Sequence, residues 1–575
     1  AGFAVMIFIG CILSPPSLMD DVDSVQAQIA RNMVQSGDWV TARLDGVAYL
    51  EKSPLVYWMM AVSYKVFGFH DWAARIPIAA SVVLLCWIVC KFGEWAFGAT
   101  AGMYAGICLA TCVGLFLFTR ILIPDCILTL AIAVALYSML RLLEDDRPAR
   151  WPMLFWASTA IAVLLKGLIG VIFPIGAGVL FLVATRRLTK WKTLKSFRPV
   201  PGLLLFLAIA APWFVVATIR NPPLFDFTTH SESGSYHGFF WFYFINEHVL
   251  RFLNRRYPRD YNTVPHLYFW LFHLLWLFPW SVYLPAVFRL DYRSGDRAAR
   301  VRLLSVCWIG FVLVFFSLST SQEYYTMPCY PAFALLIGSA LASKDRTLGI
   351  STRLAAAINM AALIAILAIL YMVRHVPTPG DISVALTEHP EAYTLSLGHM
   401  EDLTTQAFAY LRLPLVVAGI AFAVGVIGTW RWMEKKTVLL VAVMMALFFH
   451  AARLAMVEFD PYLSSRPLAE ALLRSPEGTL IVDNPYWEFS SVFFYSNSRG
   501  LLLNGRRNNL EYGSYAPGAP NVFLQDSDLA GIWKGQTRCY LLTEKPNLPR
   551  IRGLLGVPAL HEIKESGGKY LFSNQ

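Results

Sequence analysis

Long apolar runs separated by short polar segments dominate the chain. A transmembrane helix needs about 20 apolar residues, and most of these runs reach or approach that length. The pattern predicts a mainly α-helical, polytopic membrane protein with about thirteen transmembrane helices. The predicted spans are residues 1–13, 72–92, 100–118, 121–140, 151–165, 168–184, 201–219, 266–288, 303–320, 325–343, 354–373, 413–430 and 437–454. The first run is short, so we expect part of a helix to precede Ala1; a cleaved signal peptide is the alternative.

The short polar segments between these runs indicate the orientation of the chain. Lys and Arg recur in the segments 91–99, 141–150, 185–200, 289–302, 344–353 and 431–436. If the first span runs outward, all six segments lie on one side of the membrane, and the positive-inside rule makes that side cytoplasmic. An odd number of spans then places the C-terminal tail on the outer side.

The outer face is predicted to hold three long loops and the tail. The loops are residues 14–71, 220–265 and 374–412. Two amphipathic stretches in the first loop, Val22 to Gln35 and Pro54 to Phe67, favour helices along the membrane interface. The chain thus divides into a transmembrane domain, 1–455, and a soluble domain, 456–575. Helix-like (Leu468 to Leu473) and strand-like (Thr479 to Val482, Gly500 to Leu503, Cys539 to Leu542) runs predict a small α/β fold for the tail.

Composition excludes two broad classes of protein. The 575 residues are 57% hydrophobic and 15% charged, and the mean hydropathy is +0.51, which is atypical of a soluble domain. The net charge of +10 follows membrane topology rather than a nucleic-acid-binding face, so we expect membrane lipids and no nucleic acid among the partners. Eight of the nine cysteines lie in apolar runs, and no disulfide framework or CxxC metal motif is indicated.

Three acidic residues open the first outer loop. Asp20, Asp21 and Asp23 follow directly on the first predicted span. One of them could act as a general base at the membrane surface, taking a proton from an acceptor hydroxyl. The alternative is that they only favour the N-terminus of the helix that starts near Val22.

Charged residues also occur at the outer ends of two predicted spans. Asp125 lies one or two turns inside a span, where an unpartnered carboxylate costs a few kcal/mol, and Arg120 is a possible structural partner. Lys166 lies between two closely spaced runs and precedes Gly167. It either snorkels to the interface or faces a cavity.

The second outer loop is basic on a side where basic residues are otherwise scarce. Arg251 and Arg255 suit phosphate, and anionic lipid headgroups are the alternative. Glu51 and His248 could share a metal ion, although two ligands do not define a site. Tyr324 and Tyr325, in a short outer turn, are either interfacial anchors or hydroxyl donors to a phosphate.

Taken in order, these segments resemble the bacterial aminoarabinose-to-lipid-A transferases and the related protein O-mannosyltransferases, which use polyprenyl-phosphate sugars and share the GT-C fold. The most specific stretch runs from the acidic cluster through residues 28–33, 36–39 and 45–46 to residues 49–58. Arg75-Ile-Pro, the Asp125 turn, Lys166-Gly, Glu247-His248 and the Tyr325-Thr-Met-Pro turn follow in the family's order.

The resemblance implies roles for individual residues. An acid of the first cluster would be catalytic, with Asp21 aligning best after a one-residue shift, and Asp125 would help to position substrate. Lys52 and Tyr325 would contact the donor phosphate, and a structural zinc would lie at Glu51 and His248; no other cofactor is expected. We add Arg75, Arg120, Lys166, Arg251, Arg255 and Tyr324 as candidate substrate-binding residues. Here the family's acidic pair and following Arg are replaced by Asp20-Asp21-Val22-Asp23 and Val25, so one phosphate contact of the aminoarabinose enzymes is missing.

These features together predict a membrane glycosyltransferase of the bacterial inner membrane, with its site and tail on the periplasmic side. It would move a sugar from a polyprenyl phosphate, with inversion, to a lipid A-like or protein acceptor. A multi-span transporter or flippase is the main alternative, although no internal repeat is evident and the polar residues gather at the outer ends of spans. A non-catalytic scaffold would leave the clustered acids and arginines without a reason.

Overall fold

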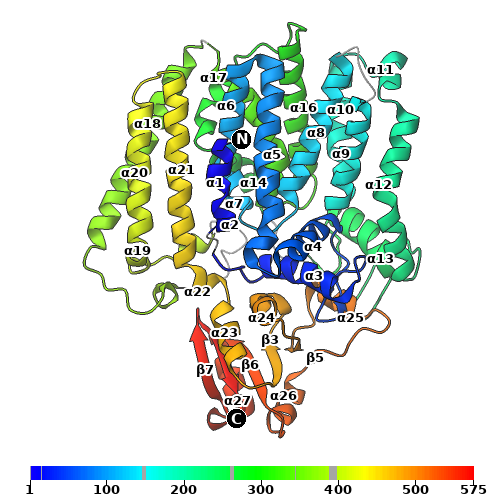
Figure 1. Cartoon of the computed structure of the whole chain (residues 1–575), viewed down its shortest axis with the longest axis vertical. Coiled ribbons are helices and arrows are strands. Elements are labelled where there is room, and N and C mark those ends of the chain that lie inside the picture. The colour runs from blue at the N-terminus through cyan, green and yellow to red at the C-terminus, as the bar shows by residue number, and fades with distance from the viewer. Residues whose placement is uncertain (1, 14–15, 145–149, 260–263, 344, 388–397) are drawn as a thin grey trace.

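The computed structural model describes residues 2–13, 16–144, 150–259, 264–343, 345–387 and 398–575. Figure 1 shows a wide bundle of roughly parallel helices above a smaller domain that contains the strands. Two helices of the first outer loop, α3 (Asp23–Ser36) and α4 (Leu55–Phe67), lie between these two layers (Figure 1). The chain therefore has a mainly α-helical membrane bundle and a small α/β tail, which confirms the predicted fold class.

The helices of the bundle follow the apolar runs of the sequence. The most buried long helix is α8, in which 72% of the most apolar window is buried, against 17% in α18 at the side of the bundle (Figure 1). A helix that is apolar all round needs either protein neighbours or lipid around it, and these two helices show both cases. The bundle comprises α1 (Gly2–Phe8), α2 (Gly10–Leu13), α5 (Asp71–Phe97), α6 (Ala99–Ala110), α7 (Val113–Phe118), α8 (Asp125–Glu144), α9 (Arg150–Lys166), α10 (Ile169–Ala184), α11 (Trp191–Ser196), α12 (Pro199–Arg220), α14 (His266–Trp276), η2 (Trp280–Tyr283), α15 (Leu284–Val287), α16 (Arg297–Ser317), η3 (Glu323–Cys329), α17 (Tyr330–Leu341), α18 (Thr347–Met372), α20 (Arg412–Thr429) and α21 (Lys435–Glu458).

The predicted count of about thirteen spans is not confirmed. Within the described ranges, seven helices are long and apolar enough to cross a membrane, or eight if α14 and the η2–α15 segment, bent by 92°, form one span. Several apolar runs are interrupted in the structure. The run 100–118 is divided between α6 and α7, and the run 325–343 begins with the 3₁₀ helix η3 and continues as α17, which has 12 residues. Hydropathy does not record such breaks, because the residues at them are apolar too.

The outer loops form short elements around the lower end of the bundle. The first loop contains α3, the hairpin β1 (Arg43–Leu44) and β2 (Val47–Ala48), and α4. The second contains α13 (Gly238–Phe240) and the π-helix η1 (Trp241–Leu250). The described part of the third contains η4 (Ile382–Ala385), η6 (Gly398–Asp402) and α19 (Ala407–Tyr410); the predicted loop 374–412 otherwise lies partly outside the described residues.

Helices form at both amphipathic stretches of the first loop, but α3 is covered more completely than an interfacial helix would be. Its buried residues include the polar side chains of Gln26 and Gln28. The tail explains this burial, because Arg31 on α3 donates a hydrogen bond of 2.7 Å to the carbonyl oxygen of Phe494 in the tail. Thus α3 lies between two protein surfaces.

The tail is an α/β domain built on a six-stranded sheet of order β5-β4-β3-β6-β8-β7. Strand β3 pairs in parallel with β4 and β6, β4 pairs in parallel with β5, and β8 is antiparallel to β6 and β7. The predicted strands coincide with β3, β4 and β6, and the predicted helix with α23. The elements are α22 (Asp460–Leu463), α23 (Arg466–Arg474), β3 (Thr479–Asp483), η7 (Tyr486–Phe489), α24 (Ser490–Ser496), β4 (Gly500–Leu503), α25 (Asn508–Ser514), β5 (Phe523–Leu524), α26 (Asp526–Trp533), β6 (Cys539–Glu544), η8 (Lys545–Asn547), α27 (Leu548–Leu555), η9 (Val557–Ala559), β7 (His561–Ser566) and β8 (Lys569–Ser573).

The tail contacts both of the first two outer loops through polar groups. At the first loop, Ser17 donates through its backbone N–H (2.6 Å) and its hydroxyl (2.7 Å) to the carboxylate of Asp460. At the second, Glu511 on α25 accepts hydrogen bonds from Tyr257 (2.6 Å) and Ser233 (2.9 Å). The two loops are therefore fixed by one folded domain, rather than each by its own contacts alone.

Close backbone packing at α25 gives a test of this docking. A Cβ at Gly513 would lie 1.9 Å from the carbonyl oxygen of Ala48 in β2, whereas a Cβ at Gly531 in α26 would meet no atom within 4 Å. We expect Gly513→Ala to destabilise the docked tail by about 1–3 kcal/mol through overpacking. Gly531→Ala should be neutral or stabilising by roughly 0.5–1 kcal/mol, since Ala favours helices. Thermal unfolding and limited proteolysis of the two purified variants measure the difference, and equal stability would contradict the close contact.

Candidate active site

The three acids of the first loop have three different environments. Asp20 is bound by the tail: its carboxylate accepts hydrogen bonds from the hydroxyl of Ser465 (2.6 Å), the backbone N–H of Ser491 (2.7 Å) and the ammonium of Lys569 (3.0 Å). These donors occupy the carboxylate with structural contacts. We therefore assign Asp20 a structural role, although the sequence made it a candidate base.

Asp21 is the accessible acid of the cluster. Its side chain is exposed, while its backbone has a left-handed φ of 72° and its N–H donates to the carbonyl oxygen of Trp487 at 2.9 Å. The residue as a whole is exposed, yet the protein around its carboxylate is dense enough to desolvate it. Desolvation there, followed by the negative charges of Glu488 and Asp20, raises the pKa of Asp21 to about 7. A carboxylate with such a pKa is suited to general base catalysis near neutral pH.

Asp23 is buried and supports the start of the loop. One carboxylate oxygen accepts the backbone N–H of Leu122 at 2.9 Å, and the other lies 3.6 Å from the guanidinium of Arg75. Arg75 also donates to the carbonyl oxygens of Pro16 (2.7 Å) and Ser17 (3.2 Å). No acidic side chain caps α3, whose N-cap residue is Val22. The pair of Asp23 and Arg75 thus connects the first loop to α5, so Arg75 has structural partners instead of a free face for phosphate.

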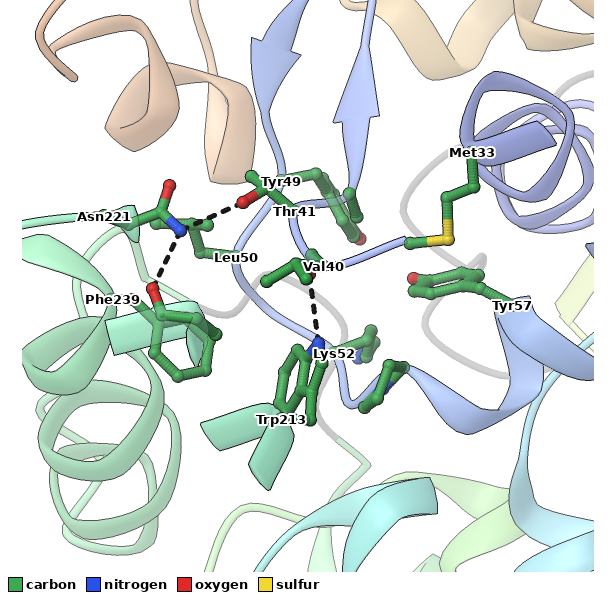
Figure 2. Close-up of a pocket in the computed structure, with 13 residues that line it drawn as sticks. Met33, Val40, Thr41, Tyr49, Leu50, Lys52, Tyr57, Trp213, Asn221 and Phe239 are labelled. Atoms are coloured by element: carbon green, nitrogen blue, oxygen red, sulfur yellow. Dashed lines mark hydrogen bonds between the residues drawn. The ribbon is translucent and has the colours of Figure 1, made fainter. Parts of the chain in front are cut away.

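Lys52 lies in the segment that joins the β1–β2 hairpin to α4. Its ammonium is paired with the carboxylate of Glu51, and its side chain is 27% exposed. Behind the stem of Lys52 is a small cavity of about 10 Å³, enough for about one water molecule. Figure 2 shows Met33, Tyr57 and Trp213 around this cavity, with Trp213 donating to the carbonyl oxygen of Val40 at 3.1 Å. The cavity is too small for a sugar. The residues that line it pack around the segment that carries Lys52.

The second outer loop presents its charges from a π-helix, a rare element that is frequent at functional sites. At the end of η1, Glu247 accepts from Arg251 at 3.0 Å and from Arg256 at 2.5 Å. Arg251 also lies 4.0 Å from Glu51, which connects this loop to the first. Burial opposes ionisation of Glu51, but Lys52, Arg256 and Arg251 outweigh that effect and lower its pKa to about 2. The result is a dense group of cations around two buried carboxylates, of which Glu51 is ionised, while burial raises the pKa of Glu247.

Asp125 pairs with Lys166 instead of Arg120. The carboxylate of Asp125, at the start of α8, lies 2.6 Å from the ammonium of Lys166 at the end of α9. That ammonium also lies 5.0 Å from the ring of Tyr324 and 4.6 Å from the ring of Tyr325, within range of cation–π attraction. Arg120 instead lies over the ring of Phe116, at 4.0 Å. Lys166 therefore faces the protein interior and does not snorkel.

These pairs meet around Tyr324. Burial is the main cause that raises the pKa of this hydroxyl well above its usual value, and the charges of Asp125, Arg251 and Glu51 also act on it. Glu51 likewise acts on Asp21. We use the name outer recess for this group of residues, which pairwise contacts and charge effects connect: Asp21, Glu51, Lys52, Asp125, Lys166, Arg251, Tyr324 and Tyr325. It combines an accessible carboxylate with cations and hydroxyls drawn from both outer loops and the ends of α8, α9 and η3.

Most of the predicted substrate-binding residues lie together in the structure, but Arg255 does not. Asp21, Lys52, Asp125, Lys166, Arg251, Tyr324 and Tyr325 come together in the outer recess. Arg255 does not: its side chain is exposed, and Arg256, one residue later, is the buried partner of Glu247. Glu488 and Lys569 were missed, because nothing in the sequence of the tail shows that these residues face the first loop.

The Lys166-Gly167 turn is fixed by His248, and this contact bears on the implied zinc. Gly167 has a φ of 65°, and a Cβ there would lie 2.2 Å from Nε2 of His248. Nε2 accepts the backbone N–H of Leu168 at 3.1 Å, and Nδ1 donates to the carbonyl oxygen of Tyr243 at 2.6 Å. Burial lowers the pKa of His248 to about 4, so the ring is neutral at pH 7.

The donor set does not fit a zinc ion. Both ring nitrogens of His248 are used by the backbone, and Glu51 is bound to Lys52 and Tyr49. In the described part of the chain, no three His, Cys, Asp or Glu side chains form a group that could hold a metal. His248 is therefore explained by its backbone contacts.

The buried ion pair of Asp125 and Lys166 can be tested by stability. Lys166→Met leaves the carboxylate of Asp125, 3% exposed, without its cation, which should cost about 3–5 kcal/mol of unfolding free energy. The double variant Asp125→Asn with Lys166→Met carries no uncompensated charge and should regain most of that loss. Denaturation of the purified proteins measures both. A double variant as unstable as Lys166→Met would show that the pair does not exist in this form.

Sequence comparison identifies relatives of this chain. A model of the dolichyl-phosphate-mannose-protein mannosyltransferase family matches residues 51–215. An undecaprenyl phosphate-alpha-4-amino-4-deoxy-L-arabinose arabinosyl transferase of Pectobacterium carotovorum is 26% identical over 62% of each chain. A protein of the same name from Pseudomonas fluorescens is 28% identical over 59% of this chain and 56% of its own length. The chain thus matches about three fifths of the length of these curated relatives.

Structural comparison extends the likeness over the whole chain. The crystal structure of ArnT from Cupriavidus metallidurans bound to undecaprenyl phosphate superposes with a TM-score of 0.79 and 21% identity, covering 100% of this chain and 97% of that one. The apo structure of the same protein gives the same values. The resemblance predicted from the sequence is thereby confirmed for the fold: the chain is a multi-span membrane protein with the GT-C fold of ArnT, and its residues 51–215 are similar to the mannosyltransferase family.

Proposed function

We propose that this protein is a glycosyltransferase that moves a sugar from a polyprenyl phosphate to a lipid A-like or protein acceptor. The relatives are named for an undecaprenyl-phosphate-linked sugar, and the structural neighbour was solved with undecaprenyl phosphate bound. The observation that carries the proposal is the outer recess. In it, cations and tyrosine hydroxyls suited to a phosphate lie near an accessible carboxylate whose pKa is about 7.

The cations of the outer recess would bind the donor phosphate. Lys52 and Arg251 supply charge from two loops, and the hydroxyl of Tyr325 supplies a hydrogen-bond donor. Their charge stabilises the phosphate as it leaves with the electron pair of the anomeric C–O bond. Lys166 lies against both tyrosine rings and is held by Asp125, so this pair would position the tyrosines. The role of Asp125 is then indirect.

Asp21 would act on the acceptor. Its carboxylate removes the proton from an acceptor hydroxyl as the oxygen attacks the anomeric carbon from the side opposite the phosphate. A single displacement of this kind inverts the anomeric centre and needs no second carboxylate as nucleophile. Holding both substrates in one recess supplies much of the rate enhancement, because the phosphate is already a good leaving group.

The proposed location is the bacterial inner membrane, with the outer recess and the tail on the periplasmic side. The support is the distribution of Lys and Arg, which places the short basic segments on the opposite side. The transporter alternative has less support, because Asp125 begins α8 and Lys166 ends α9. The paired charges thus gather at helix ends, whereas transporter sites lie near the middle of the membrane.

The assignment of Asp21 as base predicts a pH profile. A base must be ionised to accept a proton, so kcat/KM should fall as the pH drops below about 7, the raised pKa of this carboxyl. Asp21→Asn should lower the rate by about 10²–10⁴-fold. The measurement is transfer from a polyprenyl-phosphate sugar by purified protein. Asp38→Asn is the control, since Asp38 belongs to the same loop but pairs with Arg220; wild-type transfer by Asp21→Asn would refute the assignment.

Two neighbouring arginines test the phosphate site. Arg251 lies in the outer recess, whereas Arg255 is exposed outside it. We expect Arg251→Met to weaken binding of polyprenyl phosphate by about 1.5–3 kcal/mol, the contribution of a hydrogen bond to a charged group. Arg255→Met should bind as the wild type does. Binding of the labelled carrier lipid in detergent gives both affinities, and a larger loss for Arg255→Met would move the phosphate out of the recess.

A further inference from the structure

The ammonium of Lys569 connects the end of the tail sheet to the first outer loop. Lys569 begins β8, and its side chain is 12% exposed. The ammonium lies 3.0 Å from the carboxylate of Asp20, donates to the carbonyl oxygen of Glu488 at 2.5 Å and lies 5.0 Å from the ring of Phe489. The ammonium of Lys569 thus contacts both segments next to Asp21, the first outer loop at Asp20 and the tail at Glu488.

The backbone on either side of Asp21 is fixed by the tail. Asp20 donates its backbone N–H to the carbonyl oxygen of Leu463 at 2.9 Å, and Asp21 donates to Trp487 at 2.9 Å. The φ of 72° at Asp21 is unusual for a residue other than glycine. Such a backbone conformation is strained and persists only where surrounding contacts impose it. Here the contacts that impose it come from the tail.

The hairpin that carries Lys569 is itself held in place. Gly567 and Gly568 form its turn with φ values of 64° and 75°, which glycine adopts readily. A Cβ at Gly567 would lie 2.0 Å from the carbonyl oxygen of Pro461, so the turn packs directly on α22. Because of this contact, Lys569 has a fixed position relative to the end of α21 and the first loop.

We propose that Lys569 is a positioning residue for transfer: by binding Asp20 and the carbonyl of Glu488, it holds Asp21 in the left-handed conformation that points its carboxylate into the outer recess. This inference rests on the proposed function and assigns the tail a role in catalysis. Lys569 itself contacts no substrate.

The charge of Lys569 should also affect the pKa of Asp21, which gives the proposal a second measurable consequence. The acidic groups whose charge acts on Lys569 are Asp20, Glu488 and Glu544. The acidic groups that raise the pKa of Asp21 are Glu488, Asp20, Asp23 and Glu51. The cation Arg507 lies near Glu488 and lowers the pKa of that carboxyl. Removing the ammonium leaves Asp20 and Glu488 less compensated, which disfavours ionisation of Asp21 and raises its pKa. Removing the charge of Asp20 instead has the opposite effect on the pKa of Asp21.

The experiment compares Lys569→Met, Lys569→Arg, Asp20→Asn and the control Lys564→Met, an exposed lysine on β7. We expect kcat to fall about 10²-fold in Lys569→Met and in Asp20→Asn, since misplacement of a catalytic group by about 1 Å can cost that much. The KM for the donor should stay unchanged. The acid limb of the pH profile should move to higher pH in Lys569→Met and to lower pH in Asp20→Asn. Lys569→Arg should restore most of the rate, and Lys564→Met should match the wild type.

A labelling measurement separates this proposal from the proposed function. A water-soluble carbodiimide modifies protonated, accessible carboxyl groups, and peptide mass spectrometry reports the modification of Asp21 as a function of pH without any catalysis. The midpoint should shift upward in Lys569→Met relative to Lys564→Met. If wild-type protein shows no transfer but this midpoint shifts, the proposed reaction fails and the positioning contact stands. If Lys569→Met matches Lys564→Met in kcat, pH profile and labelling, the proposal is overturned. Should Lys569→Met not fold, Asp20→Asn decides by the same two readouts.

Discussion

The cost of placing charge inside protein governs the outer side of this molecule. Buried charges there need partners, and two of these partners come from distant parts of the chain: Asp125 pairs with Lys166, and Asp20 pairs with Lys569. An unpaired buried charge is far more costly than a paired one. The loops can therefore pack around these charges in few ways, and this restriction brings the residues of the outer recess together.

The paired residues have structural roles, whereas the proposed reactive group is Asp21. Asp23 and Arg75 are turned toward the backbone of the first loop, and Asp125 and Lys166 support two tyrosines. Asp21 is different because the residue is exposed while its backbone is fixed by a hydrogen bond to the tail. A group that is rigid in its main chain and free at its reactive atoms is what preorganised catalysis requires.

Sequence reasoning reached the fold class, the tail strands and most residues of the outer recess, because hydropathy, loop charge and local motifs are read directly from the chain. Sequence reasoning could not show which charged side chains form ion pairs with one another. Arg120 is closer in sequence to Asp125 than Lys166 is, yet Arg120 lies on Phe116 and Lys166 makes the ion pair. It also chose Arg255 together with Arg251, whereas the two partners of Glu247 are Arg251 and Arg256. The number of spans is not confirmed for a related reason, since breaks such as the one between α6 and α7 leave the composition of a run unchanged.

The contact between residues 20 and 569 also has a consequence for biogenesis. The first loop is synthesised early and the tail follows every helix of the bundle, so a ribosome has made nearly all of the described chain before Lys569 exists. During insertion, the helices and the basic loops can already be in place while the backbone at Asp21 is free to leave its left-handed conformation. The recess is therefore completed only when the tail has reached the same side of the membrane and folded there. Formation of the site is in this way made dependent on correct topology of the entire protein.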